Sequence, residues 1–216
     1  MAIARLASKL DDGRRRIEHV LKGGRRGDFY FPKVHKHMVN ALKELYKCIP
    51  SLKKNFCNSD YPACTFNLGP DTVCFLHNDC ANFPGIPCVV TALGDFDADY
   101  GGDLVLCDLM LRIWFPAASS IGLPSAGCSH ANTDIWPGEK RFSLTQYCAG
   151  GIMRWAGRGF RPSSSLSAKE KAEYDVRLGS QWAAQLSRFS KFKDLRRDRE
   201  ELVRWKAERH VHHSGA

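Results

Sequence analysis

Long apolar runs are missing from this chain of 216 residues. No stretch approaches the roughly 20 apolar residues that a membrane-spanning helix needs, so we expect no such helix. The first residues, Met1 to Asp12, lack the apolar core of a secretory signal. Asp11 and Asp12 also argue against a mitochondrial transit peptide. These absences favour an intracellular protein.

Closely spaced cysteine pairs are missing as well. The chain has nine cysteines, an odd number, and no C-x-x-C motif occurs. The cysteines are scattered through apolar runs. This pattern favours reduced, mostly buried thiols in an intracellular protein over a disulfide scaffold or a zinc site.

The middle of the chain has almost no net charge, although the whole chain carries +9. Residues 37–183 have a balance of −1, whereas residues 1–36 have +6 and residues 184–216 have +4. Basic flanks suit a polyanionic partner, and we expect nucleic acid, with DNA favoured over RNA. The equally weighted alternative is that these cations lie on the solvent-exposed faces of helices. Basic clusters at Arg14–Arg16 and Lys22–Arg26 suit a nuclear import signal, so a nuclear location is favoured over a cytoplasmic one.

Short apolar runs dominate the middle of the chain. They are rich in Val, Ile, Leu and Phe, and turns of Gly, Pro and Asp separate them, which is typical of an all-β domain. Many short strands of this kind suit a barrel or a jelly roll. The expected strands are 63–68, 72–77, 87–93, 103–107, 110–115, 120–123, 127–131 and 141–148.

Helical patterns flank this region on both sides. In the first thirty residues we expect a short helix and then a loop. Apolar residues recur at helical spacing from Val34 to Cys48, and Pro50 ends that helix. After a linker at residues 161–165, Ser167 and Glu170 form a capping box that opens another helix. Within and beyond that helix, apolar residues recur near helical spacing, and this stripe is expected to face the core. It consists of Trp182, Leu186, Phe189, Phe192 and Leu195 and, after a break, of Leu202, Val203 and Trp205.

These patterns divide the chain into three parts. Residues 1–48 form a basic N-terminal arm and helix. Residues 49–160 form the β core. Residues 161–216 form a C-terminal helical basic extension. We therefore expect a mainly β core with flanking α-helices at both ends of the sequence.

Two histidines and one aspartate form the candidate metal site. This ligand set is that of non-haem iron(II) oxygenases. In a strand, residues i and i+2 point to the same face, so His77 and Asp79 can reach one ion while Asn78 points away. His130 lies on a later strand that can fold back across the mouth of the barrel and complete the set. Three protein ligands leave room on the metal for a keto acid and for dioxygen.

Arg141 and Ser143 form the candidate co-substrate site. They share one face of an expected strand. A buried carboxylate such as that of 2-oxoglutarate needs a paired cation, and the guanidinium fork matches it with two hydrogen bonds. The alternative is a surface arginine at the start of a strand. The otherwise apolar strand favours the clamp.

Other polar residues are weaker candidates. Asn82, Asp95 and Asp97 lie on expected loops that could line the mouth of the pocket, although such residues usually make turns. The remaining histidines lie in helices or basic arms and are not predicted as catalytic ligands: His19, His35, His37, His210, His212 and His213.

Several motifs occur in a fixed order between Ile49 and Phe160. They are ACTFNLGPDTVCFLHND at 63–79, VTALGDFD at 90–97, GGDLVLCDL at 101–109, GEKRFSLTQY at 138–147 and AGGIMRW at 149–155. Together they resemble the TET/JBP-like dioxygenases that are expanded in mushroom-forming fungi, often in association with transposons. The chain departs from that pattern at residues 115–120 and at Cys128-Ser129, next to the expected substrate mouth.

The resemblance implies a double-stranded β-helix that depends on Fe(II) and on 2-oxoglutarate. It also implies oxidation of a methylated nucleobase, of the 5-methylcytosine or N6-methyladenine type. The iron ligands of the family correspond to His77, Asp79 and His130, and its 2-oxoglutarate arginine corresponds to Arg141.

Two other functions stay open at this point. The neutral core also suits a 2-oxoglutarate-dependent hydroxylase of a protein or a small molecule. An inactive transposon-associated copy could act as a binding module, but the intact set of candidate residues counts against it.

Overall fold

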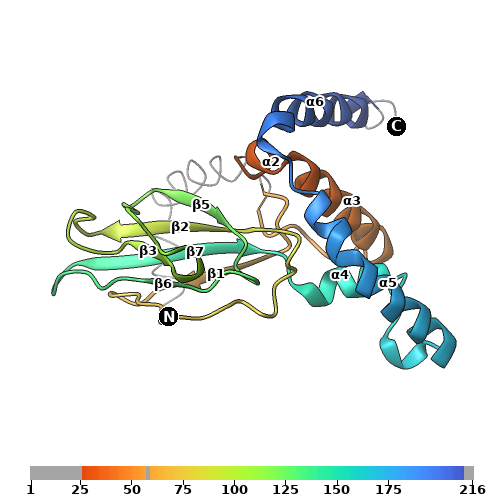
Figure 1. Ribbon diagram of the computed structural model, residues 1–216, viewed down its shortest axis with the longest axis horizontal. Helices are drawn as coiled ribbons and strands as arrows, with labels where there is room; N and C mark the ends of the chain where they lie inside the picture. Colours follow the sequence, from red (N-terminus) through yellow and green to blue (C-terminus); the bar gives the residue numbers. More distant parts are fainter. Residues whose placement is uncertain (1–25, 57–58, 212–216) are drawn as a thin grey trace.

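The structure is a computed structural model, and it describes residues 26–56 and 59–211. Within these residues, helices precede and follow a β core in the sequence (Figure 1). The preceding helices are α2 (Arg26–Tyr30) and α3 (Pro32–Cys48). The following helices are α4 (Gly150–Gly157), α5 (Ala168–Ser187) and α6 (Leu195–Val211). Short 3-10 helices are η1 (Cys107–Leu109), η2 (Ser163–Ser165) and η3 (Phe192–Asp194).

Two antiparallel sheets make up the β core. The larger sheet has the order β1 (Ala63–Asn67), β7 (Lys140–Tyr147), β2 (Cys88–Asp95) and β5 (Ser120–Leu123). The smaller sheet has the order β4 (Leu111–Ile113), β3 (Leu104–Leu106) and β6 (His130–Asn132). Neighbouring strands come from distant parts of the chain, as in a jelly roll or double-stranded β-helix. The predicted fold class, a mainly β core with helices at both ends of the sequence, is confirmed.

Seven of the eight expected strand runs overlap a strand of the structure, and the run at 72–77 does not. This segment crosses from one sheet to the other. Asp71 makes an isolated bridge with Arg141 of β7, while His77 makes one with His130 of β6. Because the segment pairs with a different sheet at each end, it cannot form a continuous ladder with either.

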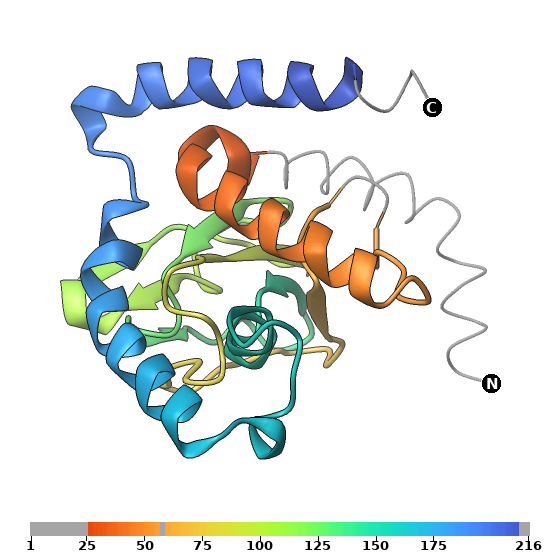
Figure 2. The ribbon, with the colours of Figure 1, turned by 90° about the vertical axis from the view of Figure 1, so that its right-hand side faces the viewer.

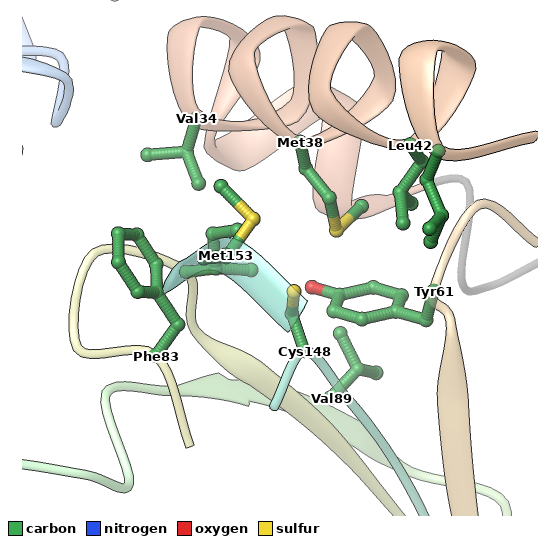
Figure 3. Close-up of a cluster of buried hydrophobic side chains, with 10 residues drawn as sticks. Val34, Met38, Leu42, Tyr61, Phe83, Val89, Cys148 and Met153 are labelled. Carbon is green, nitrogen blue, oxygen red and sulfur yellow. The ribbon is translucent and has the colours of Figure 1, made fainter. Parts of the chain in front are cut away.

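Helix α3 belongs to the same hydrophobic core as part of the larger sheet (Figure 3). Val34, Met38 and Leu42 are buried at helical spacing, as the sequence predicts. They belong to one cluster with Tyr61 and Val89. The helix ends at Cys48, just before Pro50. The division of the chain at residues 48 and 160 stays a prediction.

A second cluster fills the space between the two sheets. It contains Cys88 and Ala92 from β2, Leu104 and Leu106 from β3, and Leu123 from β5. The remaining space between the sheets is left for the polar residues described below.

The capping box of α5 is confirmed, because the Ser167 hydroxyl accepts from the backbone N–H of Glu170 and the Glu170 carboxylate accepts from the backbone N–H of Ser167. The expectation of one core-facing stripe beyond it is wrong. The chain turns after Ser187, and α6 runs at a steep angle to α5 (Figure 2). One stripe therefore cannot face one core, and Phe192 is 94% exposed.

The other members of that expected stripe divide between core and solvent. Leu186 and Val203 are exposed. Phe189 packs against the first core cluster, and Leu202 is buried. The side chain of Trp182 lies outside the described residues.

Contacts with α2 and α3 hold the C-terminal helix α6. The Arg199 guanidinium lies 3.4 Å from the ring centroid of Phe29 and donates to its backbone carbonyl. Lys206 pairs with Asp28, and Lys36 lies over the ring of Trp205. Several cations of the basic flanks are thus engaged within the protein. The cluster at 14–16, the cluster at 22–26 apart from Arg26, and the short helix expected among the first residues lie outside the described residues.

The eight cysteines within the described residues are all free thiols. Cys88, Cys128 and Cys148 are buried, but Cys48, Cys80 and Cys107 are exposed, so the expectation of mostly buried thiols is wrong. Among the described helices, none has the length and apolar character needed to cross a membrane.

Candidate functional site

A cavity of about 500 Å³ opens between the two sheets. Its volume falls within the range of roughly 300–1,000 Å³ that is usual for small-molecule sites. The residues predicted from the sequence all line this one cavity: His77, Asp79, His130, Arg141 and Ser143. The structure therefore brings the candidate metal ligands and the candidate carboxylate clamp to a single site.

His77, Asp79 and His130 converge closely enough to share one ion. Each offers a ligand atom, and these atoms all lie within 4.8 Å of one another. The distance from His77 Nε2 to Asp79 Oδ1 is 3.6 Å. The two imidazole ring centroids are 4.3 Å apart. His130 is buried, whereas His77 is more open to solvent.

Backbone pairing brings the two histidines together. The N–H of His77 donates to the carbonyl of His130 at 3.1 Å, and the N–H of His130 donates back at 3.0 Å. Two residues further on, the N–H of Asp79 donates to the carbonyl of Ser125, and a turn follows at Cys80 and Ala81. His77 and Asp79 reach one site, as expected, but the structure has no strand at residues 77–79 and Asn78, which was expected to point away, lines the same cavity. A bridge and a turn replace the expected strand.

Both histidines direct the same ring nitrogen into the cavity. Nδ1 of His77 lies 2.7 Å from the carbonyl of Phe75, and Nδ1 of His130 lies 2.9 Å from the carbonyl of Cys128. A carbonyl only accepts hydrogen bonds, so we assign the proton of each neutral ring to Nδ1. Nε2 then keeps its lone pair. Such outer contacts orient the histidines that bind metals in proteins.

The side chain of Asn82 supports Asp79. Its Nδ2 donates to Asp79 Oδ2 at 3.2 Å and to the hydroxyl of Ser125 at 3.1 Å. Its backbone N–H donates to the carbonyl of Asp79 at 2.8 Å. Asn82 thus holds Oδ2 of Asp79, while Oδ1 is the carboxylate oxygen nearest His77. Asn82 lines the cavity, as expected, but its role as a support was missed. The D-x-x-N spacing of a turn is the signal that could have indicated it.

Asp95 and Asp97, the other weak candidates for the mouth of this pocket, do not line the cavity. They lie where β2 ends and in the loop that follows it.

Arg141 is buried, with only 3% of its surface exposed. One guanidinium nitrogen, Nη1, donates to the carbonyl of Thr72 at 3.1 Å. Nε is buried and has no hydrogen-bond partner. The guanidinium also lies 5.9 Å from the ring centroid of Phe96. Burial lowers the pKa of Arg141 from its ordinary value, but an arginine remains charged in proteins. This buried cation therefore lacks an anionic partner among the described residues.

Strand alternation correctly predicted that Arg141 and Ser143 share one face of β7. Arg141, Ser143, Thr145 and Tyr147 line the cavity, while Leu144 between them is fully buried and does not line it. The hydroxyl of Ser143 accepts from Nδ2 of Asn67 on the neighbouring strand at 2.8 Å. Its own proton remains able to donate to an anion beside Arg141.

Comparisons with known proteins complete this description. No protein-family model matches the chain, and no curated protein matches it. Among solved structures, it is similar to NgTET1 in complex with 5mC DNA, with 18% identity and a TM-score of 0.40. That match covers 54% of this chain and spans only 48% of NgTET1. It is also similar to the viral collagen prolyl hydroxylase vCPH from Paramecium Bursaria Chlorella virus-1, in a 2OG complex, with 16% identity and a TM-score of 0.28. This second match covers 50% of this chain and 70% of that one.

Proposed function

We propose that this chain is an Fe(II)- and 2-oxoglutarate-dependent dioxygenase that oxidises a methylated nucleobase in nucleic acid. The observation that carries the enzymatic part is the shared cavity. It joins three potential metal ligands to a buried arginine whose Nε lacks a partner.

The donor set suits iron(II). Two imidazole nitrogens and one carboxylate with open positions are the facial set of non-haem iron oxygenases. His77, Asp79 and His130 would hold the ion, with Nε2 of each histidine available for it. When bound together, Fe(II), 2-oxoglutarate and dioxygen supply the oxidising power to hydroxylate a C–H bond.

Arg141 and Ser143 would hold the distal carboxylate of 2-oxoglutarate. A buried guanidinium with a missing partner is stabilised when a carboxylate pairs with it. The Ser143 hydroxyl lies on the same face of β7 and adds a hydrogen-bond donor. Arg141 therefore fixes one end of the co-substrate and directs its keto-acid end toward the metal ligands.

Asn82 contributes to the same reaction by holding Asp79. The hydrogen bonds from Asn82 limit rotation of the carboxylate, while the carbonyls of Phe75 and Cys128 limit rotation of the two imidazoles. Held in this way, the ligands meet the ion with little reorganisation.

The nucleobase substrate is supported by the motifs shared with TET/JBP-like dioxygenases and by a basic pocket near the helices. This second pocket, of about 480 Å³, is lined by Lys43, Lys47, Lys54 and Arg209, with Asp60 as a counter-charge. Such a group of cations suits the phosphates of a nucleic-acid strand. A base in a duplex must be flipped out to reach the cavity, at a cost of a few kcal/mol.

The test is a reaction of the purified protein with Fe(II), 2-oxoglutarate and methylated DNA, followed by mass spectrometry of the nucleosides and measurement of succinate. We expect both an oxidised base and succinate, and neither from the Asp79→Ala variant. Unchanged base oxidation by Asp79→Ala would show that the iron assignment is wrong. Succinate without base oxidation would indicate a protein or small-molecule hydroxylase. Absence of succinate would favour a binding module.

A further inference from the structure

Three aromatic side chains lie exposed at one end of the β core. Tyr100, Trp114 and Trp136 are 68%, 61% and 58% exposed. Tyr100 and Trp136 belong to the loops that follow β2 and precede β7, and Trp114 directly follows β4. This end of the larger sheet is opposite α4 and α5 (Figure 1). We call these three residues the aromatic patch.

The rings of the patch are held in place by hydrogen bonds. Nε1 of Trp114 donates to Oδ1 of Asp99 at 3.0 Å, next to Tyr100 in the chain. The rings of Tyr100 and Trp136 meet edge to face, with centroids 6.2 Å apart. Glu139 accepts from the backbone N–H groups of Trp136 and Asp97, which ties the two loops together. A ligand would therefore meet rings that are already ordered, at a low entropic cost.

The charge around the rings is strongly negative. Five carboxylates lie within residues 95–102 and 134–140, and Lys140 is the one cation in these two segments. The carboxylates are Asp95, Asp97, Asp99, Asp134 and Glu139, and all but Glu139 are exposed. Phosphates would be repelled here. Cations are favoured both by the carboxylates and by the faces of the rings.

We propose that the aromatic patch binds an arginine- and lysine-rich segment of a partner protein. Exposed aromatic residues rimmed by polar groups are typical of interaction surfaces. Charge complementarity decides the occupant, because guanidinium and ammonium groups stack on rings and pair with the surrounding carboxylates. The site lies apart from the metal centre and does not depend on the proposed oxidation reaction.

The probe is a labelled peptide of alternating arginine, glycine and lysine, and binding is measured by fluorescence anisotropy with the full chain. A peptide in which citrulline and norleucine replace the charged residues is the neutral control. We expect the basic peptide to bind and the neutral peptide not to bind. Equal binding of the two peptides overturns the proposal.

Two variants locate the binding site. Tyr100→Ala together with Trp136→Ala should weaken peptide binding by roughly four-fold or more, since a cation over an exposed ring is worth about a two- to five-fold change. Asp97→Asn together with Asp99→Asn keeps the hydrogen-bond acceptors of the turn but removes two charges. It should also weaken binding, most clearly at low salt.

Matched controls lie at the other end of the molecule. Phe192→Ala removes an exposed ring, and Glu208→Gln removes an exposed carboxylate; both should leave peptide binding unchanged. Circular dichroism melting checks that each variant folds, and the Asp97/Asp99 pair alone carries the test if the ring variant unfolds. Equal weakening by the controls would overturn the proposal. So would a ring variant that loses DNA binding but keeps the peptide.

Discussion

His77 and His130 exchange backbone hydrogen bonds in both directions, and this pair determines the geometry of the candidate metal centre. The two residues lie more than fifty positions apart in the sequence. Because they face each other across a bridge, their ring centroids lie 4.3 Å apart. The Nδ1 atom of each ring is turned to a backbone carbonyl, so both Nε2 atoms are available to one ion.

Removal of the Asn82 side chain should weaken the metal site without removing a ligand. Loss of an outer partner of a ligand typically costs about 10- to 100-fold in metal affinity or activity. We expect Asn82→Ala to reduce the affinity for Fe(II), or for Co(II) as a spectroscopic probe, by this amount. Anaerobic titration followed by optical absorption measures the change.

The control for that change is Asn55→Ala. Asn55 is exposed, and its side chain donates to the carbonyl of Pro62, away from the metal ligands. It should leave metal affinity unchanged. An Asn82→Ala protein that binds the metal as tightly as the wild type would refute a supporting role for Asn82.

Substitution of Arg141 should raise the concentration of 2-oxoglutarate that is needed. Arg141→Lys keeps a positive charge but loses the planar fork that matches a carboxylate. We expect the apparent KM for 2-oxoglutarate to rise at least about ten-fold, because paired charged hydrogen bonds contribute about 1.5–3 kcal/mol each. Steady-state succinate formation measures it. Arg112→Lys, on an exposed arginine of β4, is the matched control, and an equal effect of both changes would argue against the clamp.

Shortening a buried side chain of α3 should destabilise the protein strongly. Met38 is among the most deeply buried large side chains of the described residues. Met38→Ala leaves a cavity between α3 and the larger sheet, and such changes cost about 2–5 kcal/mol. Urea unfolding monitored by circular dichroism measures the free energy of unfolding. The exposed Val203→Ala should change it by less than about 0.5 kcal/mol, and a similar value for both would contradict the packing of α3.

The partly buried His37 should make stability sensitive to acid. Burial, with a smaller contribution from Arg188, lowers the pKa of His37 to about 4 from its ordinary 6.5. The folded state therefore keeps this ring neutral, while the unfolded state takes up a proton as the pH falls below about 6.5. The stability that His37 contributes is present above that pH and is lost progressively as the pH falls toward 4.

The measurement compares the wild type with His37→Gln in thermal melts between pH 7 and pH 4. We expect the melting temperature of the wild type to fall more than that of His37→Gln across this range. Carboxylates titrate in both proteins, so their effect cancels in the difference. Parallel curves for the two proteins would show that His37 does not have the lowered pKa.

Local patterns predicted a large part of the fold. The spacing of Val34, Met38 and Leu42 indicated one buried helix face, and alternation in β7 placed Arg141 and Ser143 on the same face. These predictions succeed because both periods are properties of the backbone itself. The stripe through Leu186 and Phe192 failed because periodicity does not reveal where a chain turns between two helices.

Sequence by itself determined which residues are chemically suited to the site, namely His77, Asp79, His130, Arg141 and Ser143. It also determined that short strands would form the core, because residue type and spacing are local properties. Only the tertiary structure decided how the metal ligands meet, through a bridge and a turn where an alternating strand was expected. It alone also left Nε of Arg141 without a partner and gathered three distant rings into one patch. The physical reason is that such contacts join segments far apart in the chain, and only their packing brings them together.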